Sequence, residues 1–240
     1  MSVVSWSRQG SVAVVSFDNG ENRHNPTFVA DFLATMAAVE ADAEVHAVVL
    51  TSSDAKNWSL GIDLAWIGAA TADRSRHDEV RAFLRGLNEV YARVLTFPTP
   101  VIAAIGGHAF GGGAILACAC DYRLMRSDRG FFCFPEVDVN IPFLPGMLAI
   151  VQRAVPAWLL DDIYLSGRRL GGQEVAEKHI AVQACDGPEA LQAAALAFAG
   201  TFHKSRAVMG EIKRRKHAQI LKILIEDDAP YIQRLALVAR

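Results

Sequence analysis

The sequence lacks a strong excess of charge of either sign. Its 240 residues include 24 lysines and arginines against 26 aspartates and glutamates, which gives a formal net charge of −2. Proteins that bind nucleic acids or anionic membranes carry an excess of positive charge over the surface that they use. Because no such excess marks this chain as a whole, we expect neither a nucleic acid nor a membrane among its partners.

Cysteine is scarce, and its spacing does not match that of metal ligands. The four cysteines are Cys118, Cys120, Cys133 and Cys185. Each stands among apolar neighbours, as buried reduced thiols do in proteins of a reducing compartment. The sequence therefore predicts free thiols and no metal site.

No uninterrupted apolar run is long enough to cross a membrane. Residues 100–120 are almost uncharged, but glycines at 106–107 and 111–113 interrupt them. The start of the chain has no basic segment followed by an apolar core, and Val238-Ala239-Arg240 does not match a peroxisomal Ser-Lys-Leu tripeptide. We therefore expect a cytoplasmic protein.

Strand and helix patterns alternate along the first half of the chain. Strands are predicted at residues 3–6, 12–17, 45–50, 101–105, 122–125, 131–134 and 180–184. A helix is predicted to begin at Pro26, further helices cover residues 80–95 and 112–120, and the chain is mostly helical from Pro145 onward. The small and polar residues 69–78 predict a mobile loop. Because alternating strands and helices form parallel βαβ units, we expect an α/β fold with a helical end.

A triple glycine between a predicted strand and a predicted helix is the most informative feature of the chain. The stretch reads Gly107-His108-Ala109-Phe110-Gly111-Gly112-Gly113. Glycine lets a ligand approach the backbone closely, and the start of a helix presents free N–H groups. A second glycine turn, Gly61-Ile62, precedes another predicted helix. Amides from two separate segments can converge on one carbonyl oxygen, so the amides of Ile62 and Gly112 are candidates for an oxyanion hole, in which each donor is worth about 3 kcal/mol.

A single glutamate follows the triple glycine in largely apolar surroundings. Glu136 comes after Pro135 and the apolar run at residues 131–134. A carboxylate in such a setting acquires a raised pKa, which makes it a better base at neutral pH. Glu136 is therefore the candidate general acid/base.

Together these motifs resemble those of the crotonase, or enoyl-CoA hydratase/isomerase, superfamily over roughly residues 12–180. The matching motifs are Asn22-Arg23-His24-Asn25, Trp58-Ser59-Leu60-Gly61-Ile62-Asp63-Leu64, the triple-glycine stretch and Pro135-Glu136. The resemblance implies a crotonase-type spiral of ββα units, an acyl-CoA thioester as ligand, and no cofactor beyond the coenzyme A of that substrate. It also implies a core at residues 1–185 that binds and converts acyl-CoA, a C-terminal helical trimerisation lobe at residues 186–240, and a homotrimer or hexamer.

The resemblance also narrows the expected activity. Hydratases of this superfamily use two glutamates, and the first of these positions is Ile115 here. One remaining carboxylate suits a proton shuttle from C2 to C4 of the acyl chain. Residues 61–66, 121–130 and 136–142 are similar to the monofunctional Δ3,Δ2-enoyl-CoA isomerases of the plant type. We therefore expect conversion of 3-enoyl-CoA to 2-enoyl-CoA, with Glu136 as the base and Ile62 and Gly112 as the oxyanion hole.

Two other functions remain open at this stage. Asp63 or Asp138 could supply the missing carboxylate of a hydratase, although an aspartate after a glycine turn is more often a helix cap. Asp138 would share a face with Glu136 if that segment were extended. A protein that binds acyl-CoA without converting it would keep the same glycine donors.

Several residues are candidates for substrate contacts. Loop arginines suit phosphates, so we assign Arg23 to coenzyme A, together with His24 and Leu60. The resemblance adds Lys213, because a late-helix lysine of this superfamily can approach the adenosine 3′-phosphate. The superfamily's Pro-Gly-x-Gly-Gly is not kept, since residues 141–146 read Ile-Pro-Phe-Leu-Pro-Gly. The sequence therefore predicts neither the start of the next helix nor the shape of the acyl pocket. By position alone, the candidates for its lining are Phe83, Leu84, Leu87, Phe143 and Leu144.

Overall fold

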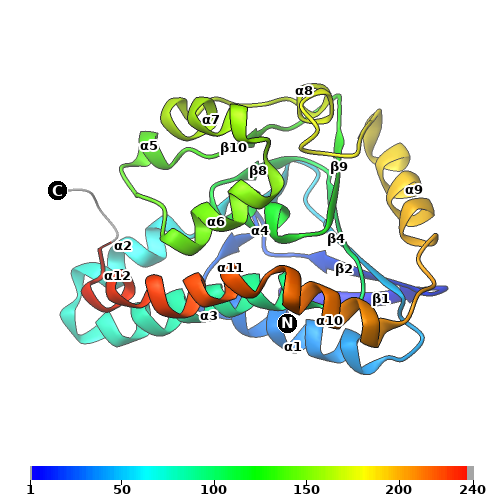
Figure 1. Ribbon diagram of the computed structural model, residues 1–240. Coiled ribbons are helices and arrows are strands. Elements are labelled where there is room, and N and C mark those ends of the chain that lie inside the picture. Colours follow the sequence, from blue (N-terminus) through cyan, green and yellow to red (C-terminus); the bar gives the residue numbers. More distant parts are fainter. Residues whose placement is uncertain (1, 237–240) are drawn as a thin grey trace.

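A six-stranded sheet lies at the centre of the molecule (Figure 1). The computed structural model describes residues 2–236, so Met1 and the C-terminal tripeptide lie outside the described residues. In spatial order the strands are β1 (Val4–Gln9), β2 (Val12–Phe17), β4 (Ala47–Ser52), β7 (Val101–Ile105), β9 (Tyr122–Arg126) and β11 (Gln183–Cys185). Strands β1 and β2 form the predicted antiparallel hairpin, and all other neighbouring pairs of this sheet are parallel. The predicted α/β class is confirmed.

Helices cover both faces of this sheet, and successive residues of its strands enter two different cores. In β4, Val48 and Leu50 belong to the larger core, whereas Ala47 and Val49 belong to the smaller one. Helix α9 (Gly187–Ala199) packs over the smaller core. Helices α1 (Pro26–Ala41), α3 (His77–Thr96) and α4 (Gly112–Ala119) contribute to the larger core (Figure 1). Burial on both faces explains why these parallel strands read as continuous apolar runs.

Two sets of short strands lie beside the main sheet. Strands β10 (Phe132–Cys133), β8 (His108–Phe110) and β5 (Asn57–Ser59) form a parallel three-stranded sheet in this order. Strand β3 (Arg23–His24) pairs in parallel with β6 (Gly61–Ile62). These pairings bring the segment before α1 and the two glycine turns into one region.

The remaining elements are mostly short helices. They are α2 (Leu64–Ala72), α5 (Glu136–Val139), α6 (Pro145–Ala154), α7 (Leu160–Ser166), α8 (Gly172–Glu177), α10 (Arg206–Lys216), α11 (Ala218–Lys222) and α12 (Ala229–Arg234), with 3-10 turns at Arg74–Arg76 and Ala157–Leu159 and a π-helical turn at Ile223–Asp227. The predicted helical end is thus confirmed. Within residues 2–236, no helix is both long and apolar enough to cross a membrane.

The prediction of a mobile loop at residues 69–78 was wrong. Helix α2 continues to Ala72, a 3-10 turn follows, and α3 begins at His77. The Asp63 carboxylate caps α2 by accepting a hydrogen bond from Trp66 N, and the Asp73 carboxylate starts the 3-10 turn by accepting one from Ser75 N. Such caps satisfy N–H groups that the first turn leaves free, so small residues with high helix propensity stay helical here.

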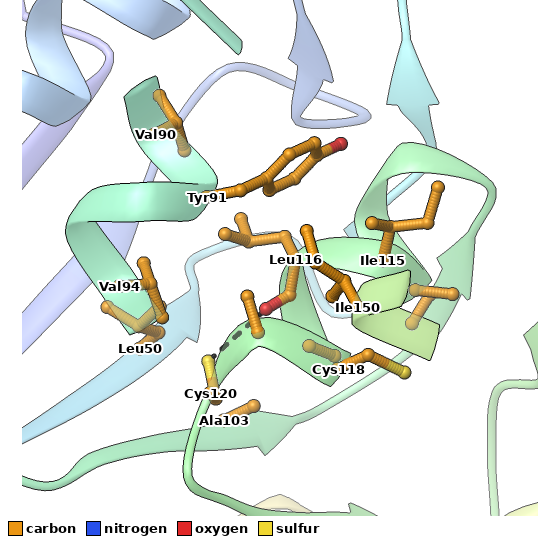
Figure 2. Close-up of a cluster of buried hydrophobic side chains, with 14 of the residues drawn as sticks. Leu50, Val90, Tyr91, Val94, Ala103, Ile115, Leu116, Cys118, Cys120 and Ile150 are labelled. Atoms are coloured by element: carbon orange, nitrogen blue, oxygen red, sulfur yellow. Dashed lines mark hydrogen bonds between the residues drawn. The ribbon is translucent and has the colours of Figure 1, made fainter. Parts of the chain in front are cut away.

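The predicted free thiols are confirmed. All four cysteines are buried and unpaired. Cys118 and Cys120 lie at the end of α4 in a cluster of apolar side chains (Figure 2). Because burial disfavours the thiolate, it raises the pKa of Cys118 to about 11 and that of Cys120 to about 12. These cysteines therefore act as packing groups.

Candidate active site

The two glycine turns meet, and their backbones are in contact. A Cβ on Gly61 would stand 2.5 Å from the backbone nitrogen of Gly112 and 2.7 Å from the carbonyl oxygen of Phe110. A Cβ on Gly112 would stand 3.3 Å from the nitrogen of Ile62. Gly61 also has a φ of +72°, which L side chains rarely adopt. Only glycine at position 61 allows the Ile62 and Gly112 amides to come this close.

Helix α4 begins at this contact and leaves its first N–H groups available. Its N-cap, Gly111, has no side chain to accept from them. The body of α4 is buried: Ile115 and Leu116 lie in the same apolar cluster as Tyr91 of α3 (Figure 2). The positive end of the helix dipole therefore points out of a rigid core towards the Gly61–Ile62 turn.

Glu136 lies beside the triple-glycine turn, next to Gly111. It is the first residue of α5, and its Oε1 would be 3.4 Å from a Cβ on Gly111. Its Oε2 is buried without a hydrogen-bond partner in the part of the chain that the structure describes. Because burial disfavours the charged form, it raises the pKa of Glu136 to about 7.

A small cavity connects these groups. Its volume is about 40 Å³, enough for a few water molecules. It is lined by Ile62, Leu84, Gly112, Ile115, Glu136, Ile141, Pro142, Leu144 and Met147. Among these residues, Glu136 is the only one with a titratable side chain. Both candidate donors and the candidate base thus border one mostly apolar space.

An open groove continues from the cavity. Glu136, Ile141 and Pro142 line both spaces, and Phe143 and Tyr164 border the groove as well. The groove has a volume of about 510 Å³. Glu136 therefore lies at the junction between an inner cavity that holds the candidate oxyanion hole and an outer apolar groove.

The positional candidates for the acyl pocket divide into two groups. Leu84 and Leu144 line the cavity and Phe143 lines the groove, whereas Phe83 and Leu87 border neither space and belong to the core. Ile141, Pro142 and Met147 also line the cavity, which the sequence did not predict. Pro145 stands at the first position of α6 and Gly146 follows it, whereas Leu148 and Ala149 occupy the places of the later two glycines of the superfamily motif.

The two aspartates considered as second acids point elsewhere. Asp63 Oδ1 accepts from Trp66 N at 3.0 Å, so Asp63 is a helix cap. The segment at Asp138 is not extended, as a shared face with Glu136 would require: α5 is a helical turn that Asn140 ends in the left-handed conformation. Residues two apart on a helix point in different directions, and Asp138 Oδ2 would be 2.6 Å from a Cβ on Gly167. Neither aspartate lines the cavity.

The candidate coenzyme A residues fall into two places. Arg23 and His24 in β3 lie next to Leu60, since β3 pairs with β6 and Leu60 N donates to Glu21 O at 3.1 Å. Arg23 is half-buried and its Nε lies 2.8 Å from Glu21 Oε2, whereas His24 is completely buried. The structure therefore puts the Arg23 side chain near the surface and the His24 ring inside the protein.

Lys213 is in a separate region. Its Nζ lies 2.6 Å from Asp121 Oδ2 and donates to the carbonyls of Val94 and Thr99. Lys213 lines a different cavity, together with Arg153 of α6 and with other residues of α10. Within the described chain its ammonium group is engaged in an intramolecular ion pair. Its contact with a 3′-phosphate stays a prediction.

Sequence reasoning also missed the interior network around His24. Ser59 was noted only as part of a motif, and His24 only as a coenzyme contact. The available signal was Ser59, a polar residue between apolar neighbours just before the helix cap at Asp63. It did not reveal that the His24 ring turns inward and stacks on Phe28, with ring centroids 4.4 Å apart.

Comparisons with known proteins identify the family of the chain. The family model described as enoyl-CoA hydratase/isomerase matches residues 7–229. Enoyl-CoA delta isomerase 2, peroxisomal, from Arabidopsis thaliana is 30% identical over 157 residues, which cover 65% of this chain and 65% of that protein. Enoyl-CoA delta isomerase 1, peroxisomal, from the same plant is 36% identical over 146 residues, 60% of this chain and 53% of that protein. The match thus spans less than two thirds of the length of either relative.

The fold has close structural neighbours. The crystal structure of a probable enoyl-CoA hydratase from Mycobacterium tuberculosis superposes with a TM-score of 0.83 at 22% identity, over 98% of this chain and 96% of that one. The crotonase-type fold implied by the sequence motifs is therefore confirmed. The family match covers nearly the whole chain, including both glycine turns and Glu136. The chain belongs to the enoyl-CoA hydratase/isomerase family.

Proposed function

We propose that this protein converts 3-enoyl-CoA to 2-enoyl-CoA thioesters. The observation that carries the proposal is the cavity that Glu136 lines together with Ile62 and Gly112, in which Glu136 is the only titratable side chain among the lining residues. The delta isomerase names of the Arabidopsis relatives point to the same reaction. The acyl-CoA thioester is the substrate and no further cofactor takes part in the proposal.

The reaction begins with the thioester oxygen at the two amides. The Glu136 carboxylate removes a proton from C2, and the electron pair of that C–H bond spreads over the chain and the thioester oxygen as a dienolate. The Ile62 and Gly112 N–H groups stabilise the oxygen that gains charge, by about 3 kcal/mol for each donor. The protonated Glu136 then returns its proton at C4, so the double bond moves from C3 to C2 and no atom is gained or lost.

The pKa of Glu136 suits both halves of this shuttle. At a pKa of about 7, the carboxylate and the carboxylic acid are both populated at neutral pH. A base is most effective when its pKa lies near the working pH, because it then accepts and returns a proton with similar ease. The apolar lining that raises the pKa also keeps water away from the dienolate.

Ile115 favours isomerisation over hydration. A hydratase must orient and activate a water molecule, and in this family a second glutamate does so. The Ile115 side chain is 1% exposed and borders the cavity, but it can neither accept a proton nor hold a water molecule. With Asp63 and Asp138 turned away, the hydratase alternative has no second carboxylate in this cavity.

The experiment that tests the proposal offers purified protein a 3-enoyl-CoA and its 2-enoyl isomer in parallel. We expect an isobaric product from the 3-enoyl substrate, resolved by chromatography and mass spectrometry, and no such product from Glu136→Gln. A gain of one water by the 2-enoyl substrate would instead establish a hydratase. Tight binding of both thioesters without any product would establish an acyl-CoA-binding protein.

The assembly and the location belong to the same proposal. Large apolar side chains such as Trp158, Leu165 and Ile225 are exposed in the single chain, at 69%, 75% and 73%. Surfaces of this kind mark subunit contacts, in line with the homotrimer or hexamer expected from the family motifs. Light scattering after size exclusion tests the assembly, and fractionation of the source cells tests the expected cytoplasmic location.

A further inference from the structure

His24 is completely buried beside the two amides of the candidate oxyanion hole. Its Nδ1 lies 3.2 Å from the point where a Cβ on Gly112 would stand, and that same point is 3.3 Å from Ile62 N. On its other side the ring stacks on Phe28. The imidazole thus fills the space between α1 and the backbone that carries both donors.

The hydrogen bonds around Ser59 determine which ring nitrogen of His24 carries the proton. Ser59 Oγ donates its single hydrogen to Asn22 O at 2.7 Å and accepts from Gly61 N at 3.2 Å. The Nε2 of His24 lies 3.0 Å from the same Oγ. Since the hydroxyl hydrogen is already used, Nε2–H must be the donor in this contact.

The other ring nitrogen is then an unprotonated acceptor. His24 Nδ1 is buried and has no hydrogen-bond partner among the described residues. Burial lowers the pKa of His24 to about 3, so the ring is neutral at physiological pH. A proton on Nδ1 would also place positive charge against the positive end of α4. His24 is therefore a neutral ring with one defined tautomer.

This network joins the three segments that form the hole. Asn22 and His24 precede α1, Ser59 and Gly61 belong to the first glycine turn, and the start of α4 touches both. A Cβ on Gly113 would collide with the Ser59 carbonyl oxygen, which shows how closely α4 packs on this turn. A buried polar network that is bonded in this way holds its members in one arrangement.

We propose that His24 is a positioning residue of the oxyanion hole: its Nε2–H···Ser59 hydrogen bond holds the ring against Gly112 and so sets the spacing of the Ile62 and Gly112 amides. His24 itself does not touch the reacting atoms. The kinetic part of this inference rests on the proposed isomerase function. Its structural part, the tautomer and the link to Ser59, does not.

The kinetic test compares three substitutions in the full-length protein. His24→Gln keeps a donor near the position of Nε2, His24→Asn offers an amide near the position of Nδ1 only, and His24→Leu keeps volume without a donor. For 3-enoyl-CoA we expect kcat to fall by about tenfold or more in the Asn and Leu variants, since complete loss of one donor costs about 10²–10³-fold. KM should stay within about twofold in all three variants, because the contacts with the bound substrate are unchanged. The Gln variant should retain most of kcat, because it keeps the donor to Ser59.

Ser59→Ala serves as the matched variant on the other side of the hydrogen bond. We expect it to reproduce the kcat loss of His24→Leu, and the double variant to be no worse than either single one, because both remove the same contact. An active Asn variant with an inactive Gln variant would overturn the proposal, since Nδ1 would then contact the ligand. Equal activity of all variants would also overturn it, and circular dichroism excludes unfolding as the cause of any loss.

A measurement without turnover separates this inference from the proposed function. In protein labelled with ¹⁵N-histidine, we expect the two ring nitrogens of His24 to show the Nε2–H tautomer unchanged from about pH 5 to pH 8. In the Ser59→Ala variant we expect the ¹⁵N resonances of the two His24 ring nitrogens to shift, because the hydrogen bond of Nε2–H is lost. Titration of His24 near the ordinary histidine pKa, or an Nδ1–H tautomer, contradicts the proposal even if the enzyme proves to be an isomerase.

Discussion

The amide of Gly112 lies against the Cα of Gly61, so that a methyl group on Gly61 would stand 2.5 Å from the Gly112 nitrogen. This contact between two residues that are 51 positions apart creates the candidate oxyanion hole. It depends on an absent side chain at one position and on a helix start at the other. Because both requirements are local, each can be changed by a single substitution.

Gly61→Ala should remove most activity and also destabilise the protein. The new Cβ meets backbone atoms that cannot move aside, and a left-handed conformation costs an L residue about 1–2 kcal/mol in addition. We expect a fall of kcat and a lower midpoint of urea unfolding. Gly68→Ala is the matched control, since Gly68 lies within α2 with nothing within 4 Å of an added Cβ. An active Gly61→Ala enzyme would show that the two amides are not used.

The rate should depend on pH through Glu136. The base is active as the carboxylate, so kcat/KM should rise tenfold per pH unit below its pKa of about 7 and level off above it. A pH–rate profile with the 3-enoyl substrate measures this directly. If kcat/KM instead levels off near the ordinary pKa of a glutamate, Glu136 is either not desolvated in the free enzyme or not the base.

Glu136→Gln should lose activity but gain stability at high pH. Proton transfer by a side chain contributes about 10²–10⁴-fold, so we expect a loss of that size. The pKa of Glu136 is about 4.5 in the unfolded chain and about 7 in the folded protein, so the unfolded state ionises first as pH rises. The free energy of unfolding therefore falls between about pH 4.5 and about pH 7. Removal of the charge should therefore stabilise the fold by about 3 kcal/mol at pH 8 and by little at pH 4. Urea unfolding at the two pH values tests the sign.

Asp63→Ala distinguishes a helix cap from a catalytic acid. Loss of the hydrogen bond to Trp66 N should cost about 1 kcal/mol of unfolding free energy. Isomerase activity should stay within a few-fold of the parent, and Asp63→Asn, which still caps, should be close to the parent in stability. If instead Asp63→Ala abolishes turnover without affecting stability, the carboxylate takes part in the chemistry.

Lys213→Met tests whether this lysine serves the fold or the coenzyme. Removal of one member of a buried ion pair costs on the order of 3 kcal/mol. Arg153, whose Nη2 lies 3.8 Å from Asp121 Oδ1, offsets part of this cost. We expect this loss of stability with an unchanged KM for the thioester. The comparison substrate is the same thioester made with dephospho-coenzyme A. A KM that rises in the variant only for the phosphorylated form would place Lys213 at the 3′-phosphate after all.

The sequence by itself determined the class of fold and supplied the candidate residues of the site. Short apolar or alternating strand segments, the start of the helix at Pro26 and the glycine turns at 61 and 111–113 are local signals. They are readable because turn geometry and apolar periodicity act over a few residues. Glu136 could be identified because a lone carboxylate between apolar runs is unusual.

Local signals were insufficient where capping and pairing decide the outcome. Residues 69–78 are small and polar, yet the Asp63 and Asp73 caps keep them helical. Asp138 resembled a neighbour of Glu136 until the helical turn of α5 directed it towards Gly167. In the first case side-chain caps kept the backbone helical, and in the second a helical turn changed the direction of a side chain.

Only the tertiary structure decided how the site is assembled. The contact of Gly61 with Gly112, the cavity shared by Glu136 and Ile115, and the inward ring of His24 join segments that are distant in the chain. Such contacts depend on how β6, α4 and α5 pack, and composition or spacing does not encode a distance between them. The burial that raises the pKa of Glu136 and lowers that of His24 arises from the same packing, because it removes water from groups that are polar in the sequence.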